Sequence, residues 1–150
     1  MLAISHALVA LTLFGQLLFS ADLQAGEPLV LEVFIATVFP VNGRDDRRLQ
    51  GATVTVYSVD GLEQFESTLS QNLPAKADAA KVEALRRIGE LDHARMAPAK
   101  DAAIGLAKAV QYGVDRYPAV VVNGTVVVYG LTDLGEAVAR YEAWREARSQ

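Results

Sequence analysis

The segment Tyr112–Tyr129 reads YGVDRYPAVVVNGTVVVY, and it predicts a helix end, two short strands and the turn between them. Gly113 is placed to end a preceding helix, because glycine adopts the left-handed conformation without steric penalty. Pro118 opens a run of β-branched valines at the first position of a strand, where a missing N–H does least damage. Asn123-Gly124 predicts a type I′ hairpin turn, because that turn needs a positive φ at both central residues.

Apolar patterns on either side of this segment predict further strands and helices. The run 29–36 is nearly all apolar, which is typical of a strand buried on both faces, and 53–59 alternates more cleanly. Helices are expected over about 60–71 and 75–91, from Pro98 towards Gly113, and from Asp133 onward. Strands at both ends with helices between them predict an α/β domain, built as a mixed sheet covered by helices.

The spacing of side chains also predicts how these helices begin and which faces are apolar. Asp60 with Glu63, and Asp133 with Glu136, each form a capping pair at a helix start. In the helix over 75–91, the expected apolar face is Val82, Leu85 and Ile88, with Arg86, Arg87 and Glu90 towards water. In the helix from Pro98, it is Ala103, Ile104, Ala107 and Val110. In the last helix, it is Leu134, Ala137, Val138 and Tyr141, continued by Trp144.

The first 25 residues predict export. An apolar-dominated run over 7–19 is followed by Leu23-Gln24-Ala25, which ends in a small residue suited to cleavage. This run suits a signal-peptide core and falls short of the ~20 residues needed to span a bilayer. No Lys or Arg precedes the run, so a start site placed too late and an uncleaved interfacial anchor stay as alternatives. We expect a signal peptide over 1–25, a single domain over 26–150, a periplasmic location and no stable membrane span.

Composition excludes several functions. Without the leader, 14 basic and 17 acidic residues remain, a net charge of −3. Direct nucleic-acid binding is not expected, because it needs a concentrated basic footprint. The chain has no cysteine, so there is no CxxC motif, and neither thiol redox catalysis nor a lipoprotein anchor is available to it.

No residue pattern predicts catalysis, so we expect a non-enzymatic protein with no cofactor, no metal site and no catalytic residue. His93 lies between Asp92 and Arg95 and is expected to be a solvated residue at a helix end. A Ser-His-Asp triad would have to use this histidine, and no nucleophile-elbow motif surrounds any serine. Asp45-Asp46 is expected to lie in a charge-balanced, solvated loop; the alternative is acid–base chemistry or cation binding.

Three features are candidates for protein binding. Arg116, Tyr117 and Pro118 precede a strand whose backbone could be offered to an extended peptide; the alternative is that Pro118 only fixes the start of the strand. The loop 38–50 is long enough to be functional or merely mobile. Trp144 either anchors the last helix on the sheet or, if exposed, marks a contact surface. Whether the Tyr117-Pro118 bond is cis stays open.

Four stretches carry a family resemblance: EVFIATVFP, VTVYSVD, LSQNLPA and YGVDRYPAVVVNGTVVVYGLTDLGEAVARY. Together they resemble the exported integrating conjugative element proteins of thioredoxin-like, TrbC-like type, over about residues 31–141. A hairpin opened by an X-Pro bond and followed by a helix is also similar to the second half of a thioredoxin-like domain. The chain departs from a typical thioredoxin in lacking an obvious helix between its first two strands.

The resemblance implies a component of a conjugative, type IV secretion-like DNA transfer system. Such a component acts in assembly of the mating-pair or pilus apparatus, and its expected partners are other proteins of that apparatus. The resemblance transfers no catalytic residue. The alternative expectation is a periplasmic, chaperone-like peptide-binding protein with a redox-inactive thioredoxin fold. The sequence predicts neither the partner's identity nor the oligomeric state.

Overall fold

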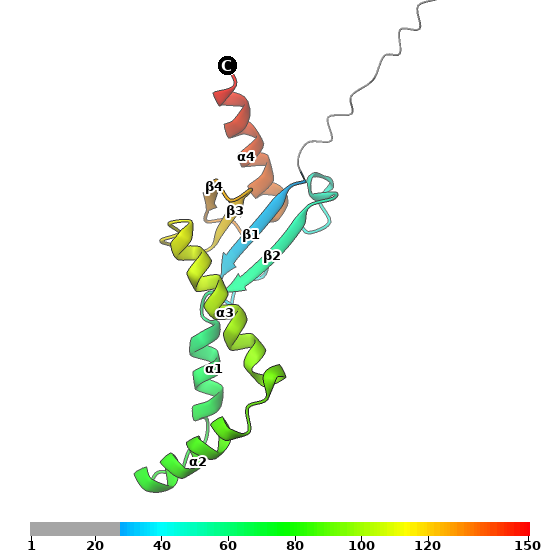
Figure 1. The fold of residues 1–150 in the computed structure, drawn as a ribbon. Helices are drawn as coiled ribbons and strands as arrows, with labels where there is room; N and C mark the ends of the chain where they lie inside the picture. Colours follow the sequence, from blue (N-terminus) through cyan, green and yellow to red (C-terminus); the bar gives the residue numbers. More distant parts are fainter. Residues whose placement is uncertain (1–27) are drawn as a thin grey trace, which may run out of the picture.

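A mixed four-stranded sheet forms the centre of the molecule in a computed structural model, which describes residues 28–150 (Figure 1). The strands are β1 (Val30–Ile35), β2 (Thr53–Ser58), β3 (Ala119–Val122) and β4 (Val126–Tyr129), in the order β2-β1-β3-β4. β1 pairs with β2 in parallel, and β3 pairs with both β1 and β4 antiparallel. The predicted α/β class is confirmed, while the expected signal peptide lies outside the described residues.

The hairpin between β3 and β4 forms as its sequence predicts. Asn123 and Gly124 have φ values of 49° and 66°, and the Thr125 N–H donates to the Val122 carbonyl at 3.1 Å. The Asn123 side chain also accepts a hydrogen bond from the Val30 N–H at 2.8 Å. The turn residue therefore ties the hairpin to the start of the central strand β1.

Helices cover the two faces of the sheet unequally. They are the 3₁₀ turn η1 (Arg47–Leu49), α1 (Gly61–Ser70), α2 (Ala77–Gly89), α3 (His93–Gln111) and α4 (Leu134–Arg148). η1 and α4 pack on one face, where Leu49, Leu134 and Val138 are buried against β1 and β3. The C-terminal half of α3 packs on the other face, where Ala109 lies against Phe34 and Val121.

The end of α3 is a Schellman motif. Gly113 has a φ of 65° and donates its N–H to the Val110 carbonyl, and the Val114 N–H donates to the Ala109 carbonyl at 2.8 Å. Val114 and Ala109 are both buried in the same cluster, which supplies the apolar contact that commonly accompanies this motif. The predicted role of Gly113 is confirmed.

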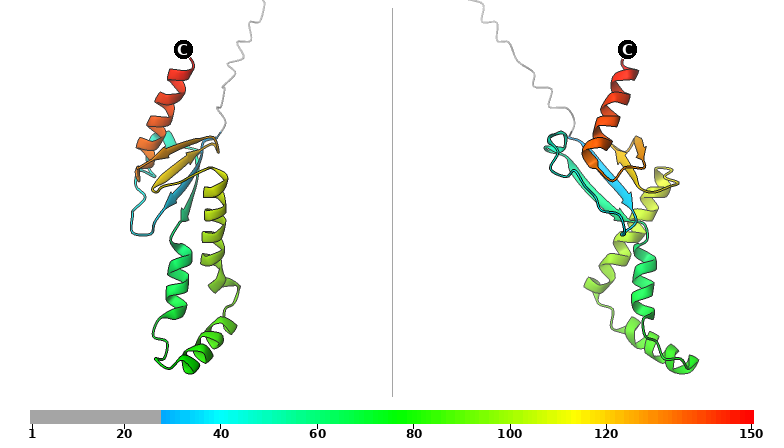
Figure 2. Two further views of the ribbon diagram at one scale, coloured as in Figure 1. Left: turned by 90° about the vertical axis from the view of Figure 1, so that its left-hand side faces the viewer. Right: turned by 180° about the vertical axis from the view of Figure 1, so that it is seen from behind.

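α1, α2 and the first half of α3 form an arm that extends beyond the sheet (Figures 1 and 2). Neither α1 nor α2 has a buried residue. The apolar face predicted on α2 is exposed: the fractional exposures of Val82, Leu85 and Ile88 are 68%, 59% and 53%. Arg87, which was expected to point to water, is only partly exposed and donates to the Leu69 and Gln71 carbonyls at the end of α1.

Two predictions for α3 are wrong. The helix begins at His93 rather than near Pro98, because Asp92 caps it by accepting from the Arg95 N–H at 2.8 Å. The buried face consists of the small residues Ala99, Ala102, Gly105 and Ala109. Ile104 and Val110, predicted on the apolar face, are exposed at 40% and 82%. Small residues let the helix backbone lie close to the sheet, where larger ones would clash.

The start of α1 also differs from expectation. The Asp60 side chain makes no capping bond; its carboxylate instead accepts from Thr37, Ser58 and Gln64. The second predicted cap is confirmed, since Asp133 accepts from the Glu136 N–H at 2.9 Å. Among residues 28–150, no helix combines the length and the apolar character that a membrane span requires.

Candidate functional site

Pro118 lies at one end of the sheet, immediately before the inner strand β3. The register pairs Phe34 with Ala119, so Pro118 stands beside the C-terminal end of β1, and the Tyr117-Pro118 peptide bond is cis. The Pro118 carbonyl accepts from the Gly130 N–H at 2.9 Å, which closes the far end of the hairpin.

The residues before Pro118 are open to solvent. Tyr117 is 39% exposed, and the Arg116 guanidinium lies 4.7 Å from the centre of the Tyr129 ring. Within residues 28–150, the backbone N–H and C=O groups of Arg116 and Tyr117 make no hydrogen bond. Of the predicted contact residues, Arg116 and Tyr117 thus have backbone groups without a partner in this part of the chain, whereas the Pro118 carbonyl is bonded to Gly130.

A short apolar turn follows β1 at the same end of the sheet. The Phe39 N–H donates to the Ala36 carbonyl at 3.0 Å, and this turn exposes Val38 (77%) and Phe39 (47%). These side chains were predicted only as part of the loop 38–50. We use the name Pro118 corner for Val38, Phe39, Arg116, Tyr117 and Pro118.

Asp60 holds the turn in place. Its carboxylate accepts from the Thr37 N–H at 3.0 Å, the Thr37 hydroxyl at 2.9 Å and the Ser58 hydroxyl at 2.7 Å. The Ser58 hydrogen bond is the largest cause that lowers the pKa of Asp60 to about 2, and the bonds from Thr37 add to it. The carboxylate stays ionised at neutral pH and links the ends of β1 and β2 to the start of α1.

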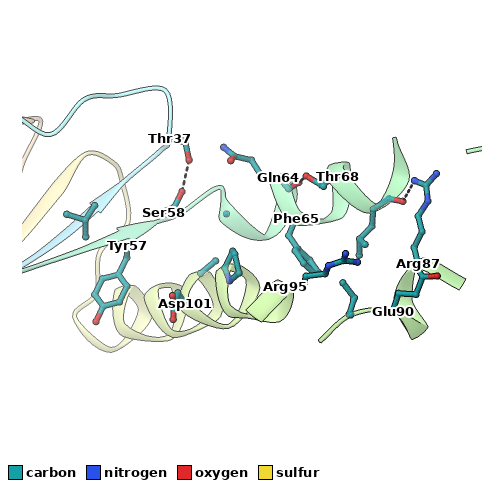
Figure 3. A pocket seen from close by; sticks show the side chains of 16 residues that line it. Thr37, Tyr57, Ser58, Gln64, Phe65, Thr68, Arg87, Glu90, Arg95 and Asp101 are labelled. Carbon is teal, nitrogen blue, oxygen red and sulfur yellow. Dashed lines mark hydrogen bonds between the residues drawn. The ribbon is translucent and has the colours of Figure 1, made fainter. Parts of the chain in front are cut away.

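A cavity of about 810 Å³ lies next to this network, between α1, α3 and the end of β2 (Figure 3). Its volume is within the range of ligand-binding pockets. The apolar part of its wall consists of Val56, Phe65, Leu69, Leu91, Pro98 and Ala102. Thr37 and Ser58 line one end and Arg87 and Glu90 the other, while Arg95 extends beside Phe65 (Figure 3).

A buried carboxylate lies in the central strand. Glu32 is 6% exposed, accepts from the Lys108 ammonium at 2.5 Å and from the Tyr112 hydroxyl, and has the Tyr57 hydroxyl at 3.4 Å. Burial raises the pKa of Glu32, but the hydrogen bonds from Lys108 and Tyr112 outweigh it and leave the pKa below its ordinary value. The hydrogen bond between Lys108 and Glu32 also raises the pKa of Lys108. The sequence analysis did not predict this cluster, although Glu32 is the one charged residue in the apolar run 29–36 and could have indicated it.

The comparisons place the chain in a family. A family model described as "Protein of unknown function (DUF1525)" matches residues 30–147. The chain belongs to this family. No curated protein and no solved structure matches the chain. The DUF1525 match runs from the first residue of β1 into the last turn of α4, so it includes the sheet, the arm and the Pro118 corner.

Trp144 of this DUF1525 chain lies apart from the sheet, near the end of α4. Its side chain is 43% exposed and stacks on Tyr141 with ring centres 6.2 Å apart. The Arg148 guanidinium lies 5.0 Å from the centre of the Trp144 ring. Neither of the two core clusters includes it. This position fits the contact-surface interpretation better than the anchoring one.

Of the remaining sequence candidates, His93 and Asp45 are exposed and Asp46 is half-buried. His93 is exposed at the first turn of α3. Asp46 caps η1 through the Arg48 N–H and pairs with the Arg48 guanidinium at 2.9 Å. Among residues 28–150, no three His, Cys, Asp or Glu side chains gather as metal ligands do.

Proposed function

We propose that this chain is an exported, non-enzymatic, protein-binding component of a conjugative DNA transfer system of the type IV secretion kind. It acts in assembly of the mating-pair or pilus apparatus, and its partners are other proteins of that apparatus. The observation that carries the binding role is the Pro118 corner, where exposed apolar side chains and backbone groups without a partner within residues 28–150 occur at the same end of the sheet. The conjugative setting rests on the resemblance of the four sequence stretches.

The chemistry of the Pro118 corner suits an extended protein segment. An extended chain supplies N–H and C=O groups that match a free backbone, and its side chains fill neighbouring apolar positions. Within the described chain the Tyr117 backbone has no hydrogen-bond partner and its side chain is half-exposed, and Val38 and Phe39 add apolar surface at the same end of the sheet. Asp60 fixes the turn that carries them, which lowers the entropy lost on binding.

The proposal also takes the domain as a redox-inactive relative of the thioredoxin fold. The proline-initiated hairpin followed by α4 supports this relationship. η1 stands where a helix between the first two strands would lie. Because the chain has no cysteine, this relationship offers it a binding surface without thiol chemistry.

Mating frequency tests the proposal. A donor that lacks the gene is compared with donors complemented by the unchanged gene, by Tyr117→Ser and by Ile104→Ser. Ile104 lies on α3 and is 40% exposed, nearly the same as Tyr117 at 39%, so it controls for the loss of an exposed apolar side chain. We expect transfer to collapse without the gene and to return with the unchanged copy and with Ile104→Ser. Tyr117→Ser should leave transfer about tenfold or more lower, as loss of a binding hot spot would.

Three other results would change the proposal. Normal transfer without the gene would remove the conjugative role. Full rescue by Tyr117→Ser would move the contact surface elsewhere, and Trp144→Ser would then be the next variant to compare. A protein found only inside the cytoplasm with residues 1–25 attached would remove export.

The second candidate is a periplasmic, chaperone-like peptide binder, and the apolar cavity between α1 and α3 favours it. Such a protein slows the aggregation of an unfolded model substrate at stoichiometric ratios. A dedicated assembly component does not. An aggregation assay with Phe65→Ser, which changes the wall of the cavity, separates the two functions.

A further inference from the structure

The exposed face of α2 and the cavity beside it are two unfilled apolar surfaces on one arm. Val82 and Leu85 on α2 are exposed at 68% and 59%, and the cavity between α1 and α3 is open at about 810 Å³. α1 and α2 have 10 and 13 residues and bury none of them. Helices this short are marginal in water unless packing covers an apolar face. A partner that covers these two surfaces would therefore stabilise the arm.

We infer that the partner of the arm is a second copy of this chain, with α2 of each copy lying in the cavity of the other. In a two-fold symmetric contact, α2 of the first copy lies in the cavity of the second, and α2 of the second lies in the cavity of the first. One occupant then covers both the α2 face and the cavity. A small apolar ligand would fill the cavity and still leave the α2 face in water.

Charges at the two surfaces are complementary. Asp78 and Lys81 lie on α2 at the N-terminal end of its apolar stripe, and Arg95 and Asp101 line the cavity. Within residues 28–150 none of these four side chains makes an ion pair or a side-chain hydrogen bond, whereas Glu83, Arg86, Arg87 and Glu90 are already paired with one another. Each copy thus offers one free acid and one free base on each of its two surfaces.

The signs of the charges fix the direction of docking. Pairing Asp78 with Arg95 and Lys81 with Asp101 sets α2 parallel to α3 of the other copy. Asp78 and Lys81 are separated by about 4.5 Å along their helix, and Arg95 and Asp101 by about 9 Å along theirs, at a rise of ~1.5 Å per residue. The long Lys81 and Arg95 side chains span the difference. The arm extends beyond the sheet, and α2 lies at the end of the arm that is farther from the sheet (Figures 1 and 2).

Cysteine cross-linking tests the inference on the full chain, which has no cysteine of its own. Two differently tagged copies are produced together, one with Ala77→Cys at the start of α2 and the other with Thr68→Cys at the cavity wall. Gly61 packs on Ala102, so Thr68 lies level with Arg95, where the docking places the start of α2. The control pair combines Ala77→Cys with Thr125→Cys, an exposed threonine in the β3–β4 turn. Under mild oxidation we expect a reducible cross-link between copies for the first pair, about tenfold above the control pair, the ratio that 1.4 kcal/mol of preferred association gives.

Charge reversal gives a second, independent readout. Asp78→Arg with Lys81→Glu should lower the cross-link about fivefold, because two attractions become repulsions. Arg95→Asp with Asp101→Lys should do the same. All four changes in one chain should restore it, because both pairs are then attractive again. The reversed positions are exposed, and circular dichroism of each variant checks that the helices remain.

Three results would overturn the inference: no cross-link above the control pair, a cross-link that charge reversal does not change, or a cross-link from Ala77→Cys to a different protein in place of the second copy. None of these three results depends on a measurement of mating frequency. Failure of self-association and failure of the conjugative role are therefore distinguishable.

Discussion

At the scale of single residues, Glu32 shows how a charge is accommodated in the central strand of an otherwise apolar core. Lys108 and Tyr112 both come from the end of α3, so the carboxylate ties that helix to β1. Tyr57 reaches the same carboxylate from β2 and stacks on Phe34 with ring centres 5.3 Å apart. The cluster therefore joins the two parallel strands and their covering helix.

Replacing this carboxylate should destabilise the fold. Glu32→Gln keeps the shape of the side chain but removes the charge that Lys108 and Tyr112 bond, and we expect a loss of about 1–3 kcal/mol in the free energy of unfolding. Urea denaturation measures it. Glu136→Gln is the control: its ion pair with Arg140 is half exposed on α4, so its loss should be about 0.5 kcal/mol or less. Equal losses for the two variants would contradict a buried role for Glu32.

Asp60 should give the protein an acid-dependent stability. Its folded-state pKa of about 2 lies below the ordinary value of 3.8, so its stabilisation is present above pH 3.8 and is lost as the pH falls towards 2. Asp60→Asn removes that contribution at every pH. We expect the difference in urea midpoint between the two proteins to be largest near neutral pH and to shrink steadily between pH 4 and pH 2. A difference that is constant over this range would show that the carboxylate charge is not involved.

At the scale of elements, the position of α3 depends on small residues rather than on large apolar ones. A Cβ added to Gly105 would lie 2.6 Å from the Cβ of Tyr57 on β2. The same addition to Gly89 at the end of α2 would meet nothing within 4 Å. One substitution therefore has opposite consequences in two helices.

Gly105→Ala should destabilise the protein and Gly89→Ala should not. Alanine favours the helix at both positions by up to about 1 kcal/mol, but at Gly105 it forces α3 away from β2, and overpacking of this kind costs about 1–3 kcal/mol. We expect a lower melting temperature for Gly105→Ala and an unchanged or higher one for Gly89→Ala. A gain in stability from both substitutions would mean that α3 does not lie this close to the sheet.

Elements set by local chemistry could be predicted from the sequence. The turn at Asn123-Gly124, the helix end at Gly113 and the cap at Asp133 each follow from the backbone preference of one or two residues. The strands followed from their apolar runs, to within one or two residues of β1 and β2.

Features set by tertiary packing could not be predicted in this way. The spacing of Ile104 and Val110 suggested a buried face, whereas the sheet selected Ala102, Gly105 and Ala109 because only small residues fit there. The Asp60 side chain does not cap α1 because it accepts hydrogen bonds from Thr37, a residue 23 positions away. At the Pro118 corner, the sequence identified Arg116 and Tyr117, but their position at the same end of the sheet as Val38 and Phe39 depends on the pairing of β1 with β3.

At the scale of the whole molecule, the structure combines a well-packed sheet with an arm that packs little. Leu31, Val33, Val120 and Val122 are fully buried between the layers, while α1 and α2 bury no residue. Local opening needs little free energy where few apolar contacts are broken. Binding of a partner to the arm would raise that free energy by mass action. The stability of the arm is thus expected to depend on its surroundings, and that of the sheet is not.

Hydrogen exchange should reveal this difference as a dependence on protein concentration. In dilute protein, we expect amides of α1 and α2 to exchange about 100-fold or more faster than those of β1 and β3, because the strands exchange only when the whole domain opens. As the concentration rises, the second copy should slow exchange in the arm and leave β1 and β3 unchanged. The charge-reversed chain Asp78→Arg, Lys81→Glu should keep fast exchange in the arm at every concentration. If the amides of the arm exchange as slowly as those of the strands in dilute protein, the arm is stable alone. That result would remove the physical reason to infer that α2 binds a second copy.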